Sequence, residues 1–252
     1  MIIDCHVHIM TSEDDELSNL LRCADRNQID QLCIASLSRT WSPRPSEEQL
    51  EEAAVDVLEA CRRFPDRFVG FTYVSADHIE KSLELIERCN VEGPCRFVKL
   101  WISQFMDDPR LTPIYERVRE LRQAVMAHTW CKATGNLEYE STFEHATRVA
   151  AQYPDLRIWI AHCSGLWEEV GRAISPYPNL CVDLSGGEPE AGIVETLLND
   201  LPAERIFFGS DAPGRNMAVQ MSKVLSAGLP PELERKILGE NIAKWIEAKP
   251  PK

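Results

Sequence analysis

The chain has 252 residues, of which 44% are hydrophobic and 27% are charged, the composition of an ordinary globular protein. Forty acidic residues against 27 basic ones give a net charge of −13, and a surface this acidic repels phosphate backbones. We therefore expect no nucleic-acid partner. No apolar run approaches the roughly 18 residues that a membrane-spanning helix needs, so we expect no membrane partner either.

Nine cysteines are scattered along the chain, their number is odd, and no C-x-x-C pair occurs. The N-terminal segment has no secretory signal pattern. Thiols in this pattern are typical of reduced, mostly buried side chains in a cytoplasmic protein. We expect a cytoplasmic location and a small-molecule substrate as partner, while the sequence leaves open whether the chain forms a homo-oligomer.

Short apolar or β-branched runs alternate with longer amphipathic segments along the whole chain. The predicted strands are 2–9, 30–37, 68–75, 96–102, 124–129, 156–162, 179–185 and 204–210. The predicted helices between them include 47–63, 77–90, 112–123 and 141–152, and a last helix covers 231–247. Ser46 and Ser141 stand where N-terminal caps of two of these helices are expected.

Strands that alternate with helices predict a parallel sheet, because parallel neighbours need a crossover connection. Eight repeats in this length give about 31 residues per unit, the size of a βαβ step. The near-continuous apolar strands suit a sheet that is covered on both sides. We expect one domain over residues 1–252, a (β/α)8 TIM barrel; an open doubly wound α/β sheet is the alternative.

The predicted first strand, "IIDCHVHI", contains an unusual pair of histidines. His6 and His8 are two residues apart, so their side chains leave the same face of a strand, about 6.6 Å apart at their backbones. Two imidazoles at that separation can bind one ion through metal–nitrogen bonds of about 2.0–2.1 Å. On its own this pair is a weak signal.

Three further polar residues close apolar strands: His128 in "AVMAH", His162 in "IWIAH" and Asp211 in "IFFGSD". Strand ends of this kind meet at the C-terminal mouth of a barrel, where active sites lie. Together with the histidine pair they predict a metal site. Nitrogen and oxygen donors suit zinc, with manganese, iron or cobalt as alternatives. A catalytic ion of this kind leaves one position for a water molecule, whose pKa falls to about 7 on zinc.

At this point the chain resembles the amidohydrolase superfamily, most closely its amidohydrolase-related branch of metal-dependent hydrolases and decarboxylases. The matching stretches are "IIDCHVHI", "RFVKLW", "VMAHT", "DLRIWIAHCSG", "RIFFGSDAP" and "ILGENIAKWI". They occur in the family's order and span nearly the whole chain. The resemblance implies a (β/α)8 barrel with the metal at its C-terminal mouth.

The resemblance also implies roles for the strand-end residues. His6 and His8 match the first-strand metal ligands and His128 matches the fifth-strand ligand. Asp211 matches an aspartate that touches the metal and handles the proton of the attacking water. His162 matches a histidine that polarises the substrate or moves protons in single-metal members and binds the second metal in two-metal members.

Lys99 lies in "FVKLW" on the predicted fourth strand, where two-metal relatives carry a carboxylated lysine. An unmodified Lys99 could instead hold a substrate carboxylate. We expect one metal, because one ion is already saturated by four ligands, His6, His8, His128 and Asp211. In a two-metal site, Lys99 and His162 would bind the second metal. A lysine here, where the metal-dependent deoxyribonucleases of the superfamily have a glutamate, argues against that activity.

Aromatic and basic residues just after strand ends are candidates for binding a planar or carboxylated substrate. Besides Lys99, we expect Trp101, Trp130 and Arg215 in this role. Loop packing is the alternative for each of them.

Other mouth and strand residues have less specific expectations. Arg39, Trp41 and Lys132 also follow strand ends and could contact substrate. Asp4 is expected behind the metal ligands, as an acceptor for a histidine or at the barrel floor, and Cys5 is expected to face the helices.

The leading functional hypothesis is a metal-dependent hydrolase of a small amide, ester or lactone. Asp211 and the metal would activate water, and His162 would polarise the scissile carbonyl. The first alternative is a nonoxidative decarboxylase of an unsaturated or aromatic acid, which would use the same ligands. A catalytically silent metal-binding barrel is the third hypothesis.

Overall fold

The computed structural model describes residues 1–187 and 190–248. Eight parallel strands lie side by side in chain order. They are β1 (Ile3–His8), β2 (Gln31–Ala35), β3 (Phe68–Tyr73), β4 (Cys95–Leu100), β5 (Ala124–Ala127), β6 (Arg157–Ile160), β7 (Leu180–Asp183) and β8 (Ile206–Phe207). Each predicted strand is present, and all eight are shorter than predicted.

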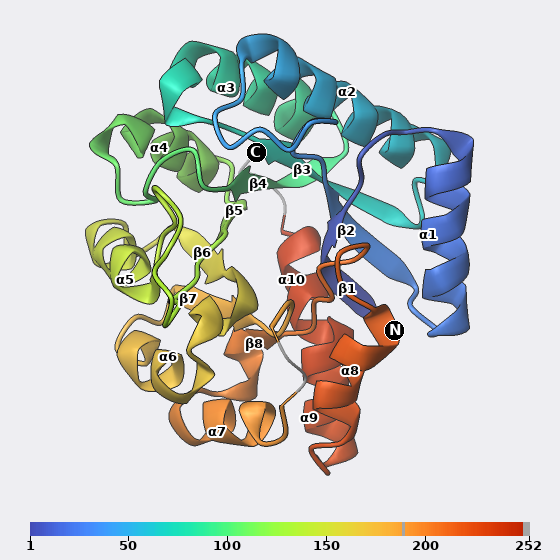
Figure 1. The fold of residues 1–252 in the computed structure, drawn as a ribbon, viewed down its shortest axis with the longest axis vertical. Coiled ribbons are helices and arrows are strands. Elements are labelled where there is room, and N and C mark those ends of the chain that lie inside the picture. The colour runs from blue at the N-terminus through green and yellow to red at the C-terminus, as the bar shows by residue number, and fades with distance from the viewer. Residues whose placement is uncertain (188–189, 249–252) are drawn as a thin grey trace.

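Helices follow the strands, and all of them except α10 form an outer ring around the strands (Figure 1). They are α1 (Asp14–Arg26), α2 (Glu47–Arg63), α3 (Ile79–Ile86), α4 (Thr112–Glu120), α5 (Phe143–Gln152), α6 (Trp167–Ile174), α7 (Ile193–Asp200), α8 (Met217–Leu225), α9 (Pro231–Arg235) and α10 (Asn241–Ile246). This arrangement confirms the predicted single-domain (β/α)8 barrel. Within the described ranges, no helix is long and apolar enough to cross a membrane.

Backbone hydrogen bonds join the last strand to the first. Cys5 N donates to Phe208 O at 3.0 Å, and beyond the end of β8 Asp211 N donates to His6 O at 2.7 Å. His8 N donates to Ala212 O, also at 2.7 Å. The ends of β1 and β8 are therefore tied together at the C-terminal mouth of the barrel.

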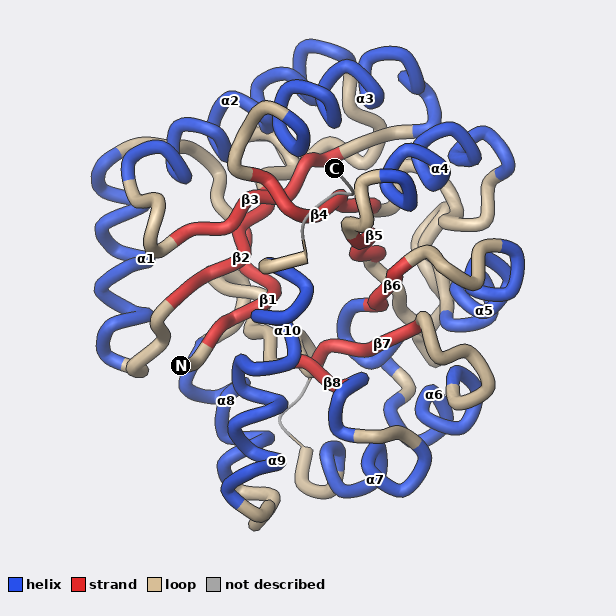
Figure 2. Tube along the Cα trace, turned by 180° about the vertical axis from the view of Figure 1, so that it is seen from behind, coloured by secondary structure: helices blue, strands red, loops and turns tan. Residues whose placement is uncertain are grey.

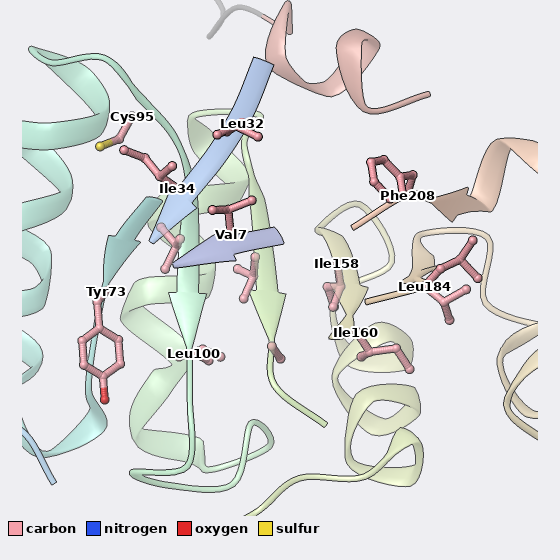
Figure 3. Close-up of a cluster of buried hydrophobic side chains, with 14 of the residues drawn as sticks. Val7, Leu32, Ile34, Tyr73, Cys95, Leu100, Ile158, Ile160, Leu184 and Phe208 are labelled. Atoms are coloured by element: carbon pink, nitrogen blue, oxygen red, sulfur yellow. The ribbon is translucent and has the colours of Figure 1, made fainter. Parts of the chain in front are cut away.

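Buried apolar side chains form two layers. The outer layer lies between the strands and the surrounding helices, and Figure 3 shows part of it, with Ile34, Ile158 and Phe208 among the labelled side chains. The inner layer draws residues from strands all around the barrel and includes Phe97 and Trp159. The barrel is thus a filled core and not a pore.

The inner layer is closed from below by α10, which lies across the ring of strands (Figure 2). Trp245 of α10 lies 5.6 Å from Trp159 and 5.0 Å from Phe207 between ring centroids, at interplanar angles of 63° and 80°. Edge-to-face contacts of this kind are favourable for aromatic pairs. The floor of the barrel is therefore built by the last helix of the described chain.

The helix caps agree in part with prediction. Ser46 caps α2 by accepting a hydrogen bond from Gln49 N at 3.3 Å, while Gln49 Oε1 accepts from Ser46 N at 2.9 Å. The prediction of Ser141 as a cap is wrong, because Thr142 is the residue before α5. Ser141 Oγ instead accepts from Met106 N at 2.9 Å and ties two loops together.

The expectation that Cys5 faces the helices is also wrong. Cys5 belongs to the inner layer, like Ile3, whereas Val7 packs in the outer layer. The pairing of β1 with β2 shifts register between Asp4 and Val7, and an irregularity of this kind breaks the alternation on which the expectation rested. His6 follows Cys5 and still faces the interior.

Candidate metal centre

Three side chains meet where β1 and β8 end. His6 Nε2 lies 3.1 Å from His8 Nε2, and Asp211 Oδ1 lies 3.7 Å and 3.4 Å from these two atoms. Ligand atoms on a tetrahedral ion with bonds of about 2.0–2.1 Å are separated by roughly 3.3 Å. The spacing of these donors therefore suits a single divalent ion.

His162 joins this group from the end of β6. His6, His162 and Asp211 each offer a donor atom, and these atoms all lie within 4.8 Å of one another. His162 begins a run of left-handed backbone, with φ of 63°, 46°, 55° and 64° for His162, Cys163, Ser164 and Gly165. Such conformations cost about 1–3 kcal/mol for each non-glycine residue and persist where the surroundings enforce them.

Two glycines make room for His162 and its neighbour Trp130. A β-carbon on Gly186 would lie 2.4 Å from His162 Nδ1, and one on Gly165 would lie 2.5 Å from Trp130 Nε1. Both glycines also have left-handed φ angles, which a side chain disfavours. The placement of His162 thus depends on residues that have no chemistry of their own.

Asp183 and Ser185, at and just after the end of β7, connect the histidines from behind. Asp183 Oδ2 lies 3.1 Å from His6 Nδ1, and Asp183 Oδ1 accepts from His162 N at 3.0 Å. The Ser185 hydroxyl donates to Asp183 Oδ1 and lies 2.8 Å from His6 Nδ1 and 3.0 Å from His162 Nδ1. One buried carboxylate and one hydroxyl therefore orient both imidazole rings.

These partners determine which ring nitrogens carry hydrogen. His6 Nδ1 faces a carboxylate oxygen and His162 Nδ1 faces Ser185 O at 3.1 Å, and both oxygens can only accept. Each Nδ1 therefore donates, so in the neutral ring each Nε2 has a free lone pair directed into the site. This is the form in which imidazole binds a metal.

The electrostatics favour neutral histidines and ionised acids. Burial lowers the pKa of His8 to about 4 and lowers that of His162 well below its usual value. Burial alone would raise the pKa of Asp211, but the hydrogen bond from His8 and the neighbouring imidazoles outweigh it and hold this pKa well below its usual value. A site of neutral imidazoles and a carboxylate fits a divalent cation in its donor chemistry.

His128 contacts the group of candidate ligands through His162, on the side away from β1. Its Nδ1 is 3.2 Å from His162 Nε2, and its Nε2 is 3.0 Å from Glu140 Oε1. Glu140 also binds the Lys132 ammonium at 2.7 and 2.8 Å. Burial opposes ionisation of Glu140, but His128 and Lys132 outweigh it and bring the pKa of Glu140 to about 2.

Lys99 lies beneath the histidines, inside the barrel. Its side chain is buried, with Nζ 3.2 Å from His6 Nε2 and 2.9 Å from Met126 Sδ. Burial lowers the pKa of Lys99 to about 8. The Lys99 ammonium therefore lies against the candidate metal ligands and not in the open part of the mouth.

Three tryptophans surround the cluster. The Trp130 ring lies 4.9 Å from His162 and the Trp41 ring 5.1 Å from His8, between centroids. The Trp101 ring lies 6.1 Å from the Trp41 ring, between centroids. Among the described residues, Trp101 makes no ring contact with a histidine, and Trp41 lies between Trp101 and His8. Of the predicted substrate-binding tryptophans, Trp130 is thus the nearer to the cluster.

Two cavities flank the site. A cavity of about 250 Å³ is bounded by Trp130, His162, Arg215 and Lys223. A second cavity, of about 630 Å³, lies between α1 and the loop after β8 and reaches His8. Arg215 lines both cavities.

Arg39 and Asp4 make contacts other than those expected from the sequence. Arg39 does not face the cluster but pairs with Asp56 at 3.3 Å and Glu52 at 3.5 Å on α2. Asp4 does not accept a hydrogen bond from an imidazole. Its Oδ1 accepts from the backbone N–H groups of His6 and Ser210, at 3.2 and 2.8 Å, and it thereby links β1 to the segment after β8.

Asp183, Ser185 and Glu140 were not among the residues predicted from sequence. Asp183 carries the same signal as His162, because it closes the apolar run "LCVD" at the end of a strand. Glu140 has no such signal, since it is one acid in a polar loop. Its role depends on contacts with His128 and Lys132 that only the folded loop creates.

Comparisons with known proteins agree with this fold. The family model described as amidohydrolase matches residues 3–247. None of the curated proteins matches the chain in sequence.

Several solved structures share the fold at low identity. The dihydroxybenzoic acid decarboxylase of Polaromonas sp. JS666, solved with manganese and 2-nitroresorcinol, is 17% identical with a TM-score of 0.81, covering 98% of this chain and 96% of that one. The 5-carboxyvanillate decarboxylase of Sphingomonas paucimobilis is 15% identical with a TM-score of 0.78, covering 98% and 99%. The 4-oxalomesaconate hydratase of Rhodopseudomonas palustris is 17% identical with a TM-score of 0.71, covering 98% and 95%.

The family match spans almost the whole chain, and it includes every strand that brings a donor to the cluster. The protein therefore belongs to the amidohydrolase family.

Proposed function

We propose that this protein is a metal-dependent decarboxylase of a small planar organic acid, with zinc as the expected ion and manganese, iron or cobalt as alternatives. The observation that carries the proposal is the 250 Å³ cavity beside His162. It lies just below the usual range of roughly 300–1,000 Å³ for ligand pockets and so suits a molecule of about one ring. The two solved decarboxylases act, by their names, on aromatic acids.

The lining of this cavity suits a planar anion. Trp130 offers an aromatic face, against which a flat ring can stack. Lys223 is buried, and its ammonium donates to Leu184 O at 2.7 Å and to Gly186 O at 2.8 Å. An ammonium group has three donors, so one remains for an acidic substituent. Arg215 adds a second cation on the same cavity, against one carboxylate among the described lining residues, Glu190, which accepts from Trp167 Nε1 at 2.8 Å.

The reaction would convert R–COO⁻ and a proton into R–H and CO₂. The C–C bond to the carboxyl carbon breaks, its electron pair stays on the ring carbon, and that carbon then takes up the proton. A divalent ion held by His6, His8, His162 and Asp211 would supply positive charge that stabilises the developing negative charge. Trp130 and Arg215 would keep the ring in place, and Asp211, whose side chain is 23% exposed, would pass the proton from solvent to the ring carbon.

Hydrolysis of a small amide, ester or lactone is the second candidate. The observation that favours it is the larger cavity, which brings solvent to His8, next to the Asp211 carboxylate at 3.4 Å. In this reaction Asp211 would take the proton of a water molecule while His162 polarises the scissile carbonyl.

One experiment distinguishes decarboxylation, hydrolysis and a catalytically silent barrel. Purified protein is assayed for bound metal, loaded with Zn²⁺ or Mn²⁺, and supplied with hydroxylated benzoates or with amides, esters and lactones in H₂¹⁸O. Decarboxylation predicts CO₂ release with no ¹⁸O in the organic product. Release of an ¹⁸O-labelled acid without CO₂ would overturn the proposal in favour of hydrolysis, and bound metal below about a tenth of an equivalent with no activation by added metal would favour the silent barrel.

The Arg215→Gln substitution provides a second check. Loss of a cation from the cavity should raise KM for the acid about 10-fold or more, since charge-assisted hydrogen bonds contribute roughly 1.5–3 kcal/mol. Arg172→Gln, at an exposed position of α6, is the matched control and should leave KM unchanged. Equal KM values for the two variants would count against the proposed cavity.

A further inference from the structure

We propose that Glu140 is a positioning residue, whose buried carboxylate fixes the tautomer and orientation of His128 at the metal centre. The inference rests on the proposed function only in placing a metal at that centre. It does not depend on which reaction the enzyme catalyses.

Glu140 stands out from the loop that contains it. The Glu140 side chain is 1% exposed, whereas residues 133–138 of the same loop are exposed to solvent. A carboxylate is buried at a cost and is found inside a protein when it is paired and hydrogen-bonded. All its partners here lie in the segment between β5 and α5.

The Glu140 carboxylate is fully used. Oε1 lies 3.0 Å from His128 Nε2 and 2.7 Å from Lys132 Nζ, and Oε2 lies 2.8 Å from Lys132 Nζ and accepts from Leu137 N at 2.9 Å. Lys132 supplies the positive charge that makes the burial tolerable. The remaining contact of Oε1, to the imidazole, is the one directed towards the metal centre.

That contact determines which nitrogen of His128 is available to a metal. A carboxylate only accepts, so His128 Nε2 carries the hydrogen and donates it to Glu140. The Nδ1 lone pair then faces His162 Nε2 at 3.2 Å, and His162 also presents a lone pair there because its Nδ1–H donates to Ser185 O. Two facing lone pairs repel, so this arrangement suits a cation between or beside the rings.

The Glu140 carboxylate also orders its own loop, because it binds both Lys132 Nζ and Leu137 N. Asn136 Oδ1 accepts from Lys132 N at 2.8 Å, and the Lys132 ammonium lies 5.7 Å from the centre of the Trp130 ring. Trp130 in turn lies against His162. Without the Glu140 carboxylate, both His128 and the Lys132 side chain would lose the group that orients them.

The experiment compares two substitutions at Glu140 with one control in the same loop. Glu140→Gln keeps the shape and the oxygen that accepts from His128, while Glu140→Leu removes the acceptor. Glu138→Gln is the control, because Glu138 is 74% exposed and pairs only with Arg44 among the ion pairs of the described residues. Circular dichroism and thermal unfolding establish that each variant is folded.

The first measurement is the ¹⁵N NMR signature of the His128 ring in metal-free protein. Wild type, Glu138→Gln and Glu140→Gln should show protonated Nε2 and bare Nδ1, and Glu140→Leu should show a mixture of tautomers. The second is the dissociation constant for Zn²⁺ from competition with a chelator. It should rise about 10- to 100-fold for Glu140→Leu, the usual effect of losing a partner behind a ligating histidine, less for Glu140→Gln, and not for Glu138→Gln.

If Glu140→Leu has the tautomer and the Zn²⁺ affinity of Glu138→Gln, the inference is overturned. A failure of the proposed decarboxylation would leave both measurements unchanged, since neither uses a substrate. If Glu140→Leu does not fold, Glu140→Ala, which also removes the acceptor, takes its place, and a tautomer and Zn²⁺ affinity equal to those of Glu138→Gln overturn the inference.

Discussion

The two sides of the metal centre are built differently. On the β1–β8 side, His6 and His8 are held by strand geometry, and Asp211, the one left-handed residue of these three at φ 65°, is tied to His6 by a backbone hydrogen bond of 2.7 Å. On the β5–β6 side, His162 is held by a left-handed backbone segment, by Gly186 and by the carboxylate of Asp183.

This difference shows where the site is vulnerable. A residue placed by strand pairing keeps its position when its neighbours change, because the ladder is supported along its length. A residue placed by a strained loop depends on each contact that enforces the strain. Substitutions without any direct role in chemistry should therefore damage the β5–β6 side far more than the β1–β8 side.

The largest expected effect follows from Asp183→Ala. This change removes the acceptor for His6 Nδ1, His162 N and the Ser185 hydroxyl, and it leaves buried donors without partners. Breaking a buried pair in this way costs about 3–5 kcal/mol. Urea unfolding of the metal-free protein measures it, and a loss below about 1 kcal/mol would mean that the two sides are not linked through Asp183.

A somewhat smaller effect is expected for Gly186→Ala. Gly186 and Gly187 both have left-handed φ angles, of 64° and 60°, but only the β-carbon on Gly186 would clash, at 2.4 Å from His162 Nδ1. Strain of about 1–2 kcal/mol and overpacking of about 1–3 kcal/mol should together cost about 2–5 kcal/mol. Gly187→Ala is the matched control, with strain alone at about 1–2 kcal/mol; similar unfolding free energies for the two variants would contradict the proposed role of Gly186 in placing His162.

The smallest effect on stability is expected for His8→Gln, on the other side of the centre. His8 Nδ1 is buried with no partner among the described residues, and strand pairing holds its backbone. The glutamine amide can also replace the contact of His8 Nε2 with Asp211, so the unfolding free energy should change by less than about 1 kcal/mol, whereas Zn²⁺ affinity should fall by a factor of 10 or more through loss of a donor. Retained Zn²⁺ affinity would show that His8 does not bind the ion.

The same contrast explains how much could be predicted from sequence. The barrel and the strand-end positions of His6, His8, His162 and Asp211 follow from apolar runs that stop at a polar residue. Regular alternation, however, failed at Cys5, because the register of β1 shifts after Asp4. The alternation of apolar and polar residues does not show where the pairing of two strands shifts by one residue.

Other parts of the site could not be foreseen for a different reason. Gly186 matters because it touches His162, 24 positions earlier in the chain, and Glu140 matters because the loop folds back onto His128. Neither residue type signals its role locally. Asp183 is different, since it closes an apolar strand and could have been found by the rule that found Asp211.

The position of α10 has a consequence for how the protein is made. Ile242 and Trp245 complete the inner layer from below, yet they follow every strand in the chain. A ribosome adds about 5–20 residues per second, always from the N-terminus, so all the barrel strands exist before their floor does. A barrel that forms before α10 packs against it would therefore expose Phe207 and Trp159 to water and to chaperones.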